Sequence, residues 1–227
     1  MSNISPVWTM LGLDVLMVFY TLWVLSIIKP AGKAGSVIGA SLLTWLAILH
    51  AGLSHQSISP QDISGVAFLM VIFVAVGVVG VVLLLIPSVR HIVLGLDQRQ
   101  LLLLQGIRVF FGAAFLMQAS LGVLPQTFGI VDGFTHIGAG FFGLVAAFSV
   151  AAGIQGERRA WFANIFGLAD ILIVASSLAF VLLPQIGPHH SMMYAVFLPA
   201  PLWLWFHVVS IWKLVSGDNR ELQAVHA

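Results

Sequence analysis

Long apolar runs separated by short polar breaks dominate the pattern of this chain. A helix that spans a bilayer needs roughly 20 apolar residues, and seven runs reach that length. The breaks contain charged residues, histidines, or proline and glycine, which end such runs. The pattern predicts helices over residues 7–28, 35–54, 65–86, 100–124, 127–153, 160–183 and 192–215.

Composition agrees with this pattern. Of the 227 residues, 60% are hydrophobic and 7% are charged, and the mean hydropathy is +1.07. A soluble domain carries about 25% charged residues, so the expected solvent of this chain is the lipid bilayer. We therefore predict an all-α fold, a single polytopic domain over residues 1–227 made of a seven-transmembrane-helix bundle.

The positions of the cationic residues predict the orientation. Cytoplasmic connections carry an excess of Lys and Arg. Here the cations fall in the first, third and fifth connections and after the last run, and the other connections carry none. Seven helices with the N-terminus outside and the C-terminus in the cytoplasm satisfy this rule. The cations that set the orientation are Lys29, Lys33, Arg90, Arg99, Arg158, Arg159, Lys213 and Arg220.

Charge and cysteine content exclude several classes of function. The net charge of +1 gives no reason to expect a nucleic-acid partner. The absence of cysteine excludes disulfides, iron–sulfur clusters and thiol catalysis. No serine hydrolase elbow, phosphate-binding loop or dinucleotide fingerprint occurs, so the sequence predicts no particular reaction.

A first group of polar residues is expected in the outer half of the bundle. Asp14, His50, Asp132 and His136 lie at a depth of roughly 6–14 Å if each helical residue rises about 1.5 Å. Asp132 and His136 are four residues apart and therefore share one helix face. Imidazole and carboxylate together suit zinc, iron or copper.

Two interpretations of this outer group stay open. In the first, a metal ion is held by His50, Asp132 and His136, with Asp14 and the loop residues His189 and His190 as further ligands, or a haem is held by His50 and His136. In the second, the same residues form hydrogen bonds that tie helices together. The glycines of the run 127–153 admit either a flat ligand or close helix packing.

A second group is expected nearer the cytoplasm. Arg108 and Asp170 lie at matching depths and predict a buried ion pair, because neither charge is stable alone in hydrocarbon. His207 and Asn164 lie nearby and extend the buried polar network. This network is expected to be either a clasp between helices or a proton relay, since histidine titrates near neutral pH.

Two prolines are expected to distort the last helix. Pro199 and Pro201 each remove a backbone donor and free a carbonyl one turn earlier, at Ala195 and Phe197. The distortion falls in the outer half of the helix.

Two stretches also carry a resemblance. WFANIFGLAD (residues 161–170) and FLPAPLWLWFHVVSIWKL (residues 197–214) resemble a family of small seven-helix bacterial membrane proteins without an assigned function. The resemblance covers about the C-terminal half. It implies a bacterial inner (plasma) membrane and implies no activity.

Three functions fit these observations. The first is a redox or sensor component that binds a metal ion or haem in the outer half of the bundle. The second is a small proton-coupled transporter that uses the buried Arg/Asp/His network. The third is an accessory subunit without catalysis, which packs against another membrane subunit in the lipid bilayer.

Overall fold

The computed structural model describes residues 6–27 and 32–217, and side chains are described except for residues 32–34. This part of the chain is helical and contains no β-strand. Lys29 and Arg220, which helped to predict the orientation, lie outside the described residues. The elements are α1 (Pro6–Ser26), α2 (Gly32–Ser54), α3 (Gly65–Leu85), α4 (Pro87–Gly95), α5 (Gln98–Leu103), α6 (Arg108–Ser120), α7 (Gln126–Ala152), α8 (Gly156–Ser177), a π-helical turn (Leu178–Leu182), α9 (Leu183–Ile186), α10 (Met193–Phe197) and α11 (Pro199–Ser216).

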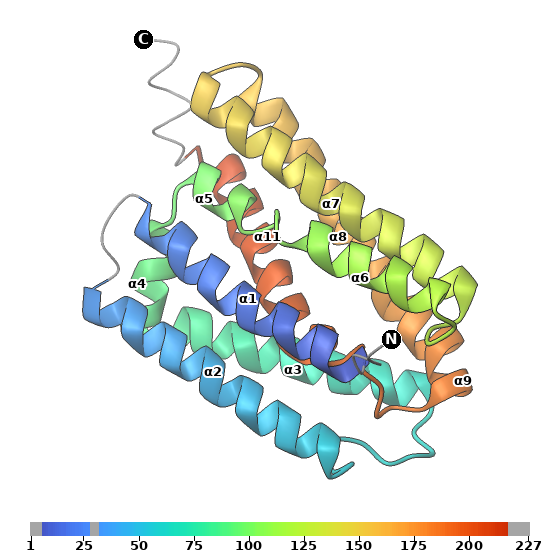
Figure 1. Ribbon diagram of the computed structural model, residues 1–227. Helices are drawn as coiled ribbons and strands as arrows, with labels where there is room; N and C mark the ends of the chain where they lie inside the picture. The colour runs from blue at the N-terminus through green and yellow to red at the C-terminus, as the bar shows by residue number, and fades with distance from the viewer. Residues whose placement is uncertain (1–5, 28–31, 218–227) are drawn as a thin grey trace.

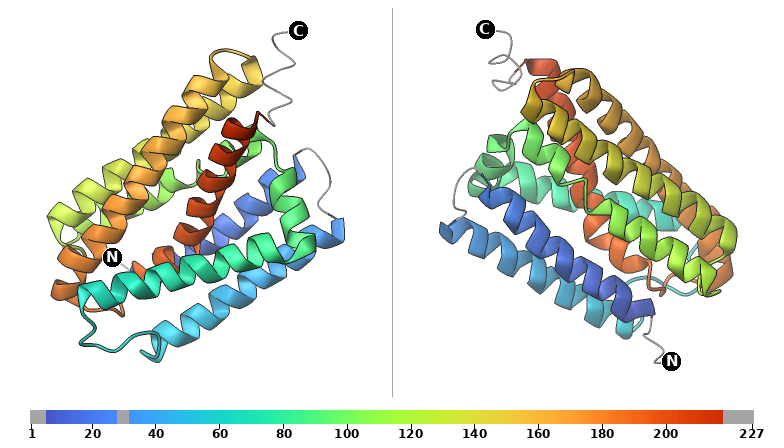
Figure 2. Two further views of the ribbon diagram at one scale, coloured as in Figure 1. Left: turned by 180° about the vertical axis from the view of Figure 1, so that it is seen from behind. Right: turned by 45° about the horizontal axis from the view of Figure 1, so that its top comes forward.

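The long helices form one bundle around α11 (Figures 1 and 2). Helices α1 and α2 pair along one side, and α7 packs against both α6 and α8 on the other. Helix α11 packs against α3, α5 and α8, so the last element of the chain runs through the middle. The start of α1 and the end of α11 lie at opposite ends of the bundle (Figure 1).

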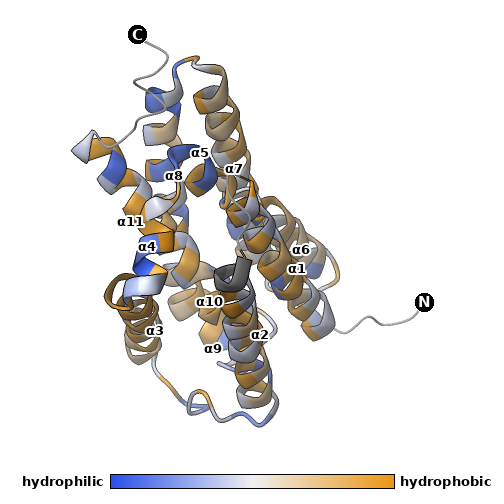
Figure 3. Cartoon of the chain, turned by 90° about the vertical axis from the view of Figure 1, so that its left-hand side faces the viewer, coloured by the Kyte–Doolittle hydropathy of each residue, from blue (hydrophilic) through white to orange (hydrophobic). Residues whose placement is uncertain are grey.

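The outside of this bundle is apolar. Large hydrophobic side chains are exposed on the outer faces of the helices, among them Met70 and Phe73 of α3, Phe134 and Phe148 of α7, and Ile165 of α8. Hydrophilic segments gather around α4, α5 and the start of α8 (Figure 3). A soluble protein rarely exposes apolar patches of this extent, so the outer faces are suited to contact with lipid.

Six helical segments of the described chain are long and apolar enough to span a membrane: Pro6–Ser26, Gly35–Ser54, Gly65–Leu85, Gln98–Ser120, Gln126–Ala152 and Gly156–Ile186. The run predicted over residues 192–215 is divided at Leu198 into α10 and α11. Helix α11 has 18 residues and carries buried His207, Ser210 and Lys213. The last helix is thus shorter than the predicted run, and these polar side chains face the inside of the bundle.

The helix predicted over residues 100–124 is not continuous. It consists of α5 and α6, which are separated by a tighter turn over residues 104–107, where backbone hydrogen bonds span three residues instead of four. Within the turn, Gln105 is buried, and its side-chain Nε2 donates to the Trp203 carbonyl oxygen at 3.5 Å. Irregular backbone at membrane depth is tolerated where protein surrounds it. The break is stable because α7 and α11 enclose it.

A carbonyl oxygen freed by a proline of the last helix accepts a hydrogen bond from another helix. Pro201 leaves the Phe197 carbonyl without its usual donor, and Trp45 Nε1 of α2 donates to that oxygen at 2.9 Å. The distortion predicted from the two prolines is therefore a break between α10 and α11, held in place by a side chain of another helix.

Glycines of α7 are positions of close helix packing. A Cβ on Gly140 would lie 2.8 Å from the backbone nitrogen of Val109, and one on Gly143 would lie 2.8 Å from Cβ of Gln105. Both distances are too short for a side chain. Small residues let α5, α6 and the turn between them approach α7 closely.

Candidate functional site

Arg108 is the centre of a buried polar network. It begins α6 directly after the turn over residues 104–107, and its side chain is fully buried. Its Nη2 donates to Asp170, forming an ion pair, and to the Gly167 carbonyl oxygen at 3.3 Å. Its Nη1 donates to Gln105 Oε1 at 3.3 Å and to His207 Nε2 at 3.0 Å. The guanidinium also lies 5.1 Å from the ring centre of Trp203, within the range of a cation–π interaction.

His136 belongs to this network and not to a separate outer group. Its Nδ1 lies 2.9 Å from Asp170 Oδ2, although the oxygen lies off the direction of an ideal ring hydrogen bond. The residue is near the middle of α7, and Asp170 is near the middle of the helical segment Gly156–Ile186. His136 of the predicted outer group and Asp170 of the predicted inner group are therefore neighbours near the centre of the bundle.

His207 is fixed as a neutral imidazole by its partners. A guanidinium only donates hydrogen bonds, so His207 Nε2 accepts from Arg108 and carries no hydrogen. Its Nδ1 then donates to Asn164 Oδ1 at 2.8 Å. Asn164 Nδ2 donates to Ser210 Oγ at 2.7 Å, and Gln98 Nε2 donates to the same oxygen at 2.5 Å. Both ring nitrogens of His207 are thus occupied, and the chain of hydrogen bonds ends at the start of α5.

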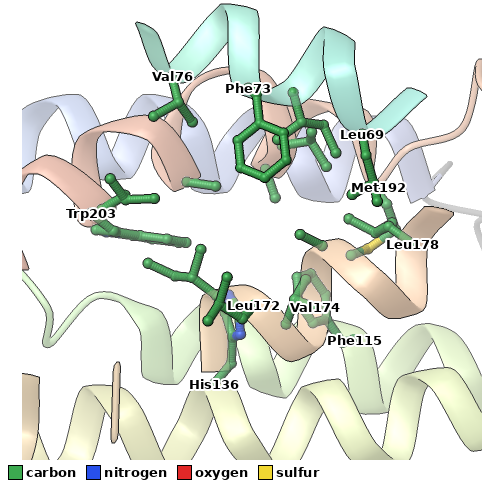
Figure 4. Close-up of a pocket in the computed structure, with 17 residues that line it drawn as sticks. Leu69, Phe73, Val76, Phe115, His136, Leu172, Val174, Leu178, Met192 and Trp203 are labelled. Carbon is green, nitrogen blue, oxygen red and sulfur yellow. The ribbon is translucent and has the colours of Figure 1, made fainter. Parts of the chain in front are cut away.

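An apolar crevice lies beside the network (Figure 4). Side chains of α3, α8, α10 and α11 line it, and its cavity volume is about 70 Å³. Phe73 of α3 and Leu172 of α8 line the crevice and are also exposed on the outer surface, so the opening lies between these two helices.

Phe115, His136 and Trp203 line the crevice and are at most 3% exposed. The imidazole of His136 projects from α7 towards the crevice (Figure 4), and its ring centre lies 5.6 Å from that of Trp203. Within the described residues, neither His136 Nε2 nor Trp203 Nε1 has a hydrogen-bond partner in the structure. The lining of the crevice is therefore apolar except for two nitrogen atoms that have no hydrogen-bond partner.

Of the remaining residues of the predicted outer group, Asp132 lies one helical turn from His136 on α7, whereas His50 has partners of its own. His50 of α2 pairs with the Tyr194 hydroxyl through Nδ1 at 2.6 Å, and its ring lies 6.1 Å from that of Trp8. Asp14 and Asp132 are fully buried, and none of their carboxyl oxygens has a hydrogen-bond partner in the described part of the chain. Buried carboxyls of this kind are stable in the protonated form.

The two loop histidines have separate partners as well. His189 Nε2 donates to the Ser59 carbonyl oxygen at 2.8 Å, which connects the segment before α10 with the segment before α3. His190 Nδ1 lies 3.4 Å from the Met192 backbone nitrogen. Across residues 6–27 and 32–217, no group of three or more His, Cys, Asp or Glu side chains is placed to hold a metal ion. The predicted histidine cluster is thus divided among four places.

His190 predicts a pH dependence of stability. Burial lowers the pKa of His190 from its ordinary 6.5 to about 4, and its Nδ1 accepts from the Met192 N–H only when it is unprotonated. Between pH 6.5 and about 4 the unfolded chain therefore binds a proton that the folded chain does not, so the free energy of unfolding falls as the pH falls through this window. The loss is at most about 1.4 kcal/mol for each pH unit.

Thermal unfolding in detergent at pH 7.5 and pH 5 measures this effect. We expect His190→Gln to lose less stability than the parent protein on acidification, because the titrating group is gone. His55→Gln, at an exposed position in the segment after α2, is the matched control and should behave like the parent. An equal loss in His190→Gln and the parent would contradict the prediction.

Several members of the site were missed by sequence reasoning. Gln98, Gln105 and Trp203 contact the network or the crevice, and Tyr194 is the partner of His50. Glutamines inside an apolar run were a usable signal, because an amide in hydrocarbon needs a partner. The role of Trp203 had no such signal, since tryptophan is common near membrane helix ends.

Several helices long enough to span a membrane, an apolar exterior and a buried polar centre define a multi-pass helical membrane protein. A family model described as "Domain of unknown function (DUF8737)" matches residues 65–215, and the chain belongs to this family. The crevice and the network around Arg108 lie inside the matched residues, whereas Asp14 and His50 lie before them. No curated protein and no solved structure matches the chain.

Proposed function

We propose that this protein binds a lipid-soluble molecule that enters the crevice sideways from the bilayer, between α3 and α8. One observation carries the proposal: an apolar crevice that opens on the lipid-facing surface is lined by buried His136. Ligand sites are typically apolar clefts with a few polar groups that orient the ligand. This crevice has that character.

The membrane topology of the proposal is seven spans, with α10 and α11 together as the seventh. The N-terminus lies outside and the C-terminus lies in the cytoplasm of a bacterial inner membrane. Helices α4 and α5, the end of α11 and the start of α8 lie at the same end of the bundle (Figure 1). These elements carry Arg90, Arg99, Lys213 and Arg158, which supports this orientation. Because the chain has no cysteine, single-cysteine variants test it. Ser57→Cys should react with a membrane-impermeant maleimide from outside, and Arg158→Cys only from inside; the reverse pattern would overturn the orientation.

Helix breaks around the crevice support a binding role. The break between α10 and α11 and the π-helical turn Leu178–Leu182 adjoin its lining residues. Single π-helical turns occur frequently at functional sites, and interrupted membrane helices line the substrate sites of transporters.

The predicted metal ion or haem remains a separate prediction, which the visible absorption spectrum and the metal content of the purified protein would test.

Photolabelling tests the binding function. The probe is hexadecanoic acid with a diazirine in its chain, added to the protein in bilayer nanodiscs. We expect cross-links to concentrate on residues that line the crevice, such as Phe73 and Leu172, and to fall several-fold in Ala175→Phe, which fills the crevice. Ala47→Phe, on an exposed position of α2, is the matched control and should label as the parent does. Uniform labelling of all lipid-facing helices, unchanged in Ala175→Phe, would overturn the proposal.

A further inference from the structure

The hydrogen-bonding state of His136 determines which head group the crevice accepts. Asp170 is held in its ionised form by the buried guanidinium of Arg108, and an ionised carboxylate only accepts hydrogen bonds. A lone pair on His136 Nδ1 facing that carboxylate at 2.9 Å would be repelled. The hydrogen of the neutral imidazole is therefore on Nδ1, and Nε2 carries the lone pair.

The acceptor on Nε2 has no partner in the protein. His136 is 3% exposed and lines the crevice, and no described residue bonds to this nitrogen. The other lining residues are apolar apart from Trp203, whose Nε1 is a donor that also lacks a partner. A polar atom that faces an apolar crevice without a partner is costly, by up to about 1–3 kcal/mol for a neutral group. A ligand that donates to Nε2 removes this cost.

We infer that the crevice binds a single-chain amphiphile whose head group carries an O–H donor, which donates to Nε2 of His136. A protonated carboxylic acid and an alcohol share this chemistry, and the apolar surroundings of the crevice favour the protonated form of the acid. The oxygen of either group can also accept from a donor such as Trp203 Nε1. The chain lies along the apolar wall formed by α3 and α8. This inference rests on the proposed function, because it specifies the ligand of the same crevice.

The network around Arg108 holds this acceptor in place. The ion pair fixes Asp170, and Asp170 sets which nitrogen of His136 carries the hydrogen. His207 does not compete for the ligand, since both of its nitrogens are bonded. Asp132 lies one helical turn from His136 on α7 and is fully buried, so it is the other ionisable group of α7 near the site. If Asp132 ionised, the field at the imidazole would change, and the test is therefore made at a single neutral pH.

Competition between matched ligands tests the inference on the unaltered protein. The diazirine hexadecanoic acid probe is displaced in nanodiscs by hexadecanoic acid, by hexadecanol, or by methyl hexadecanoate, which has the same acyl chain as the acid and no O–H. We expect the acid and the alcohol to compete about tenfold more strongly than the ester, the factor that one hydrogen bond of ordinary net strength provides. Equal competition by all three would overturn the inference and leave the binding function intact. Absence of specific labelling would overturn the function itself.

A variant of the acceptor provides the second arm. His136→Phe keeps a ring of similar size and removes Nε2, and we expect the preference for the acid and alcohol over the ester to fall to about one. Leu69→Val, a conservative change in the crevice lining, should keep the preference. An unchanged preference in folded His136→Phe would contradict the role of Nε2. If His136→Phe does not fold, the comparison of ligands on the unaltered protein still decides the question.

Discussion

Asp170→Asn will be among the most destabilising single substitutions in this protein. The asparagine leaves the guanidinium of Arg108 buried without a counter-ion, since the structure pairs it with no other carboxylate in the described residues. Removing one partner of a buried ion pair costs about 3–5 kcal/mol. In a chain of this length, 1 kcal/mol shifts the melting temperature by roughly 2–4 °C, so we expect a decrease of about 10 °C in detergent.

Two controls separate the charge effect from a general effect of the substitution. Glu157→Gln removes a carboxylate from the exposed first turn of the same helix and should change stability by less than about 0.5 kcal/mol. Adding Arg108→Met to Asp170→Asn removes the unpaired charge, and the double variant should recover much of the lost stability. A double variant as unstable as the sum of the two single variants would contradict this account.

The same ion pair shows how far sequence reasoning reaches. Few charges lie inside the apolar runs, so two opposite charges at matching depths must meet, and Arg108 and Asp170 do so. The depth of Asp170 relative to His136 was misjudged, because depths were counted from predicted helix ends. The segment Gly156–Ile186 is longer than the run predicted there, which brings Asp170 to the depth of His136.

The break between α5 and α6 was beyond sequence reasoning for a different reason. The apolar pattern continues through Gln105 and Gly106, and a single glycine in a membrane helix usually serves packing. In the turn, Gln105 bonds to the Trp203 carbonyl oxygen of the distant helix α11 and to Arg108, the first residue after the turn. Helix rotation and neighbour order decide such contacts, and neither is visible in a hydropathy pattern. The crevice was missed for the same reason, because its wall is assembled from helices far apart in the chain.

Gly167→Ala is expected to have the second large effect, because this glycine lies directly against the network. A Cβ at this position would overlap Nε2 and Cε1 of the His207 ring and would lie 3.3 Å from Arg108 Nη1. His207 is held on its other side by Asn164, so the ring cannot move away without losing a hydrogen bond. Overpacking costs about 1–3 kcal/mol, and loss of a hydrogen bond to a charged group adds about 1.5–3 kcal/mol. We expect the melting temperature to fall by about 8 °C.

Gly77→Ala is the matched control for this substitution. A Cβ there meets no atom within 4 Å, and alanine is favoured over glycine inside a helix by up to about 1 kcal/mol, so the control should leave stability unchanged or raise it. The variant His207→Ala distinguishes a local overlap from a general intolerance of α8, because it removes the ring that the new methyl group would meet. The double variant Gly167→Ala/His207→Ala should then be less destabilised than the sum of its single variants, since residues in contact are not additive. Additive losses would show that Gly167 acts independently of His207, and the role assigned to this close approach would be wrong.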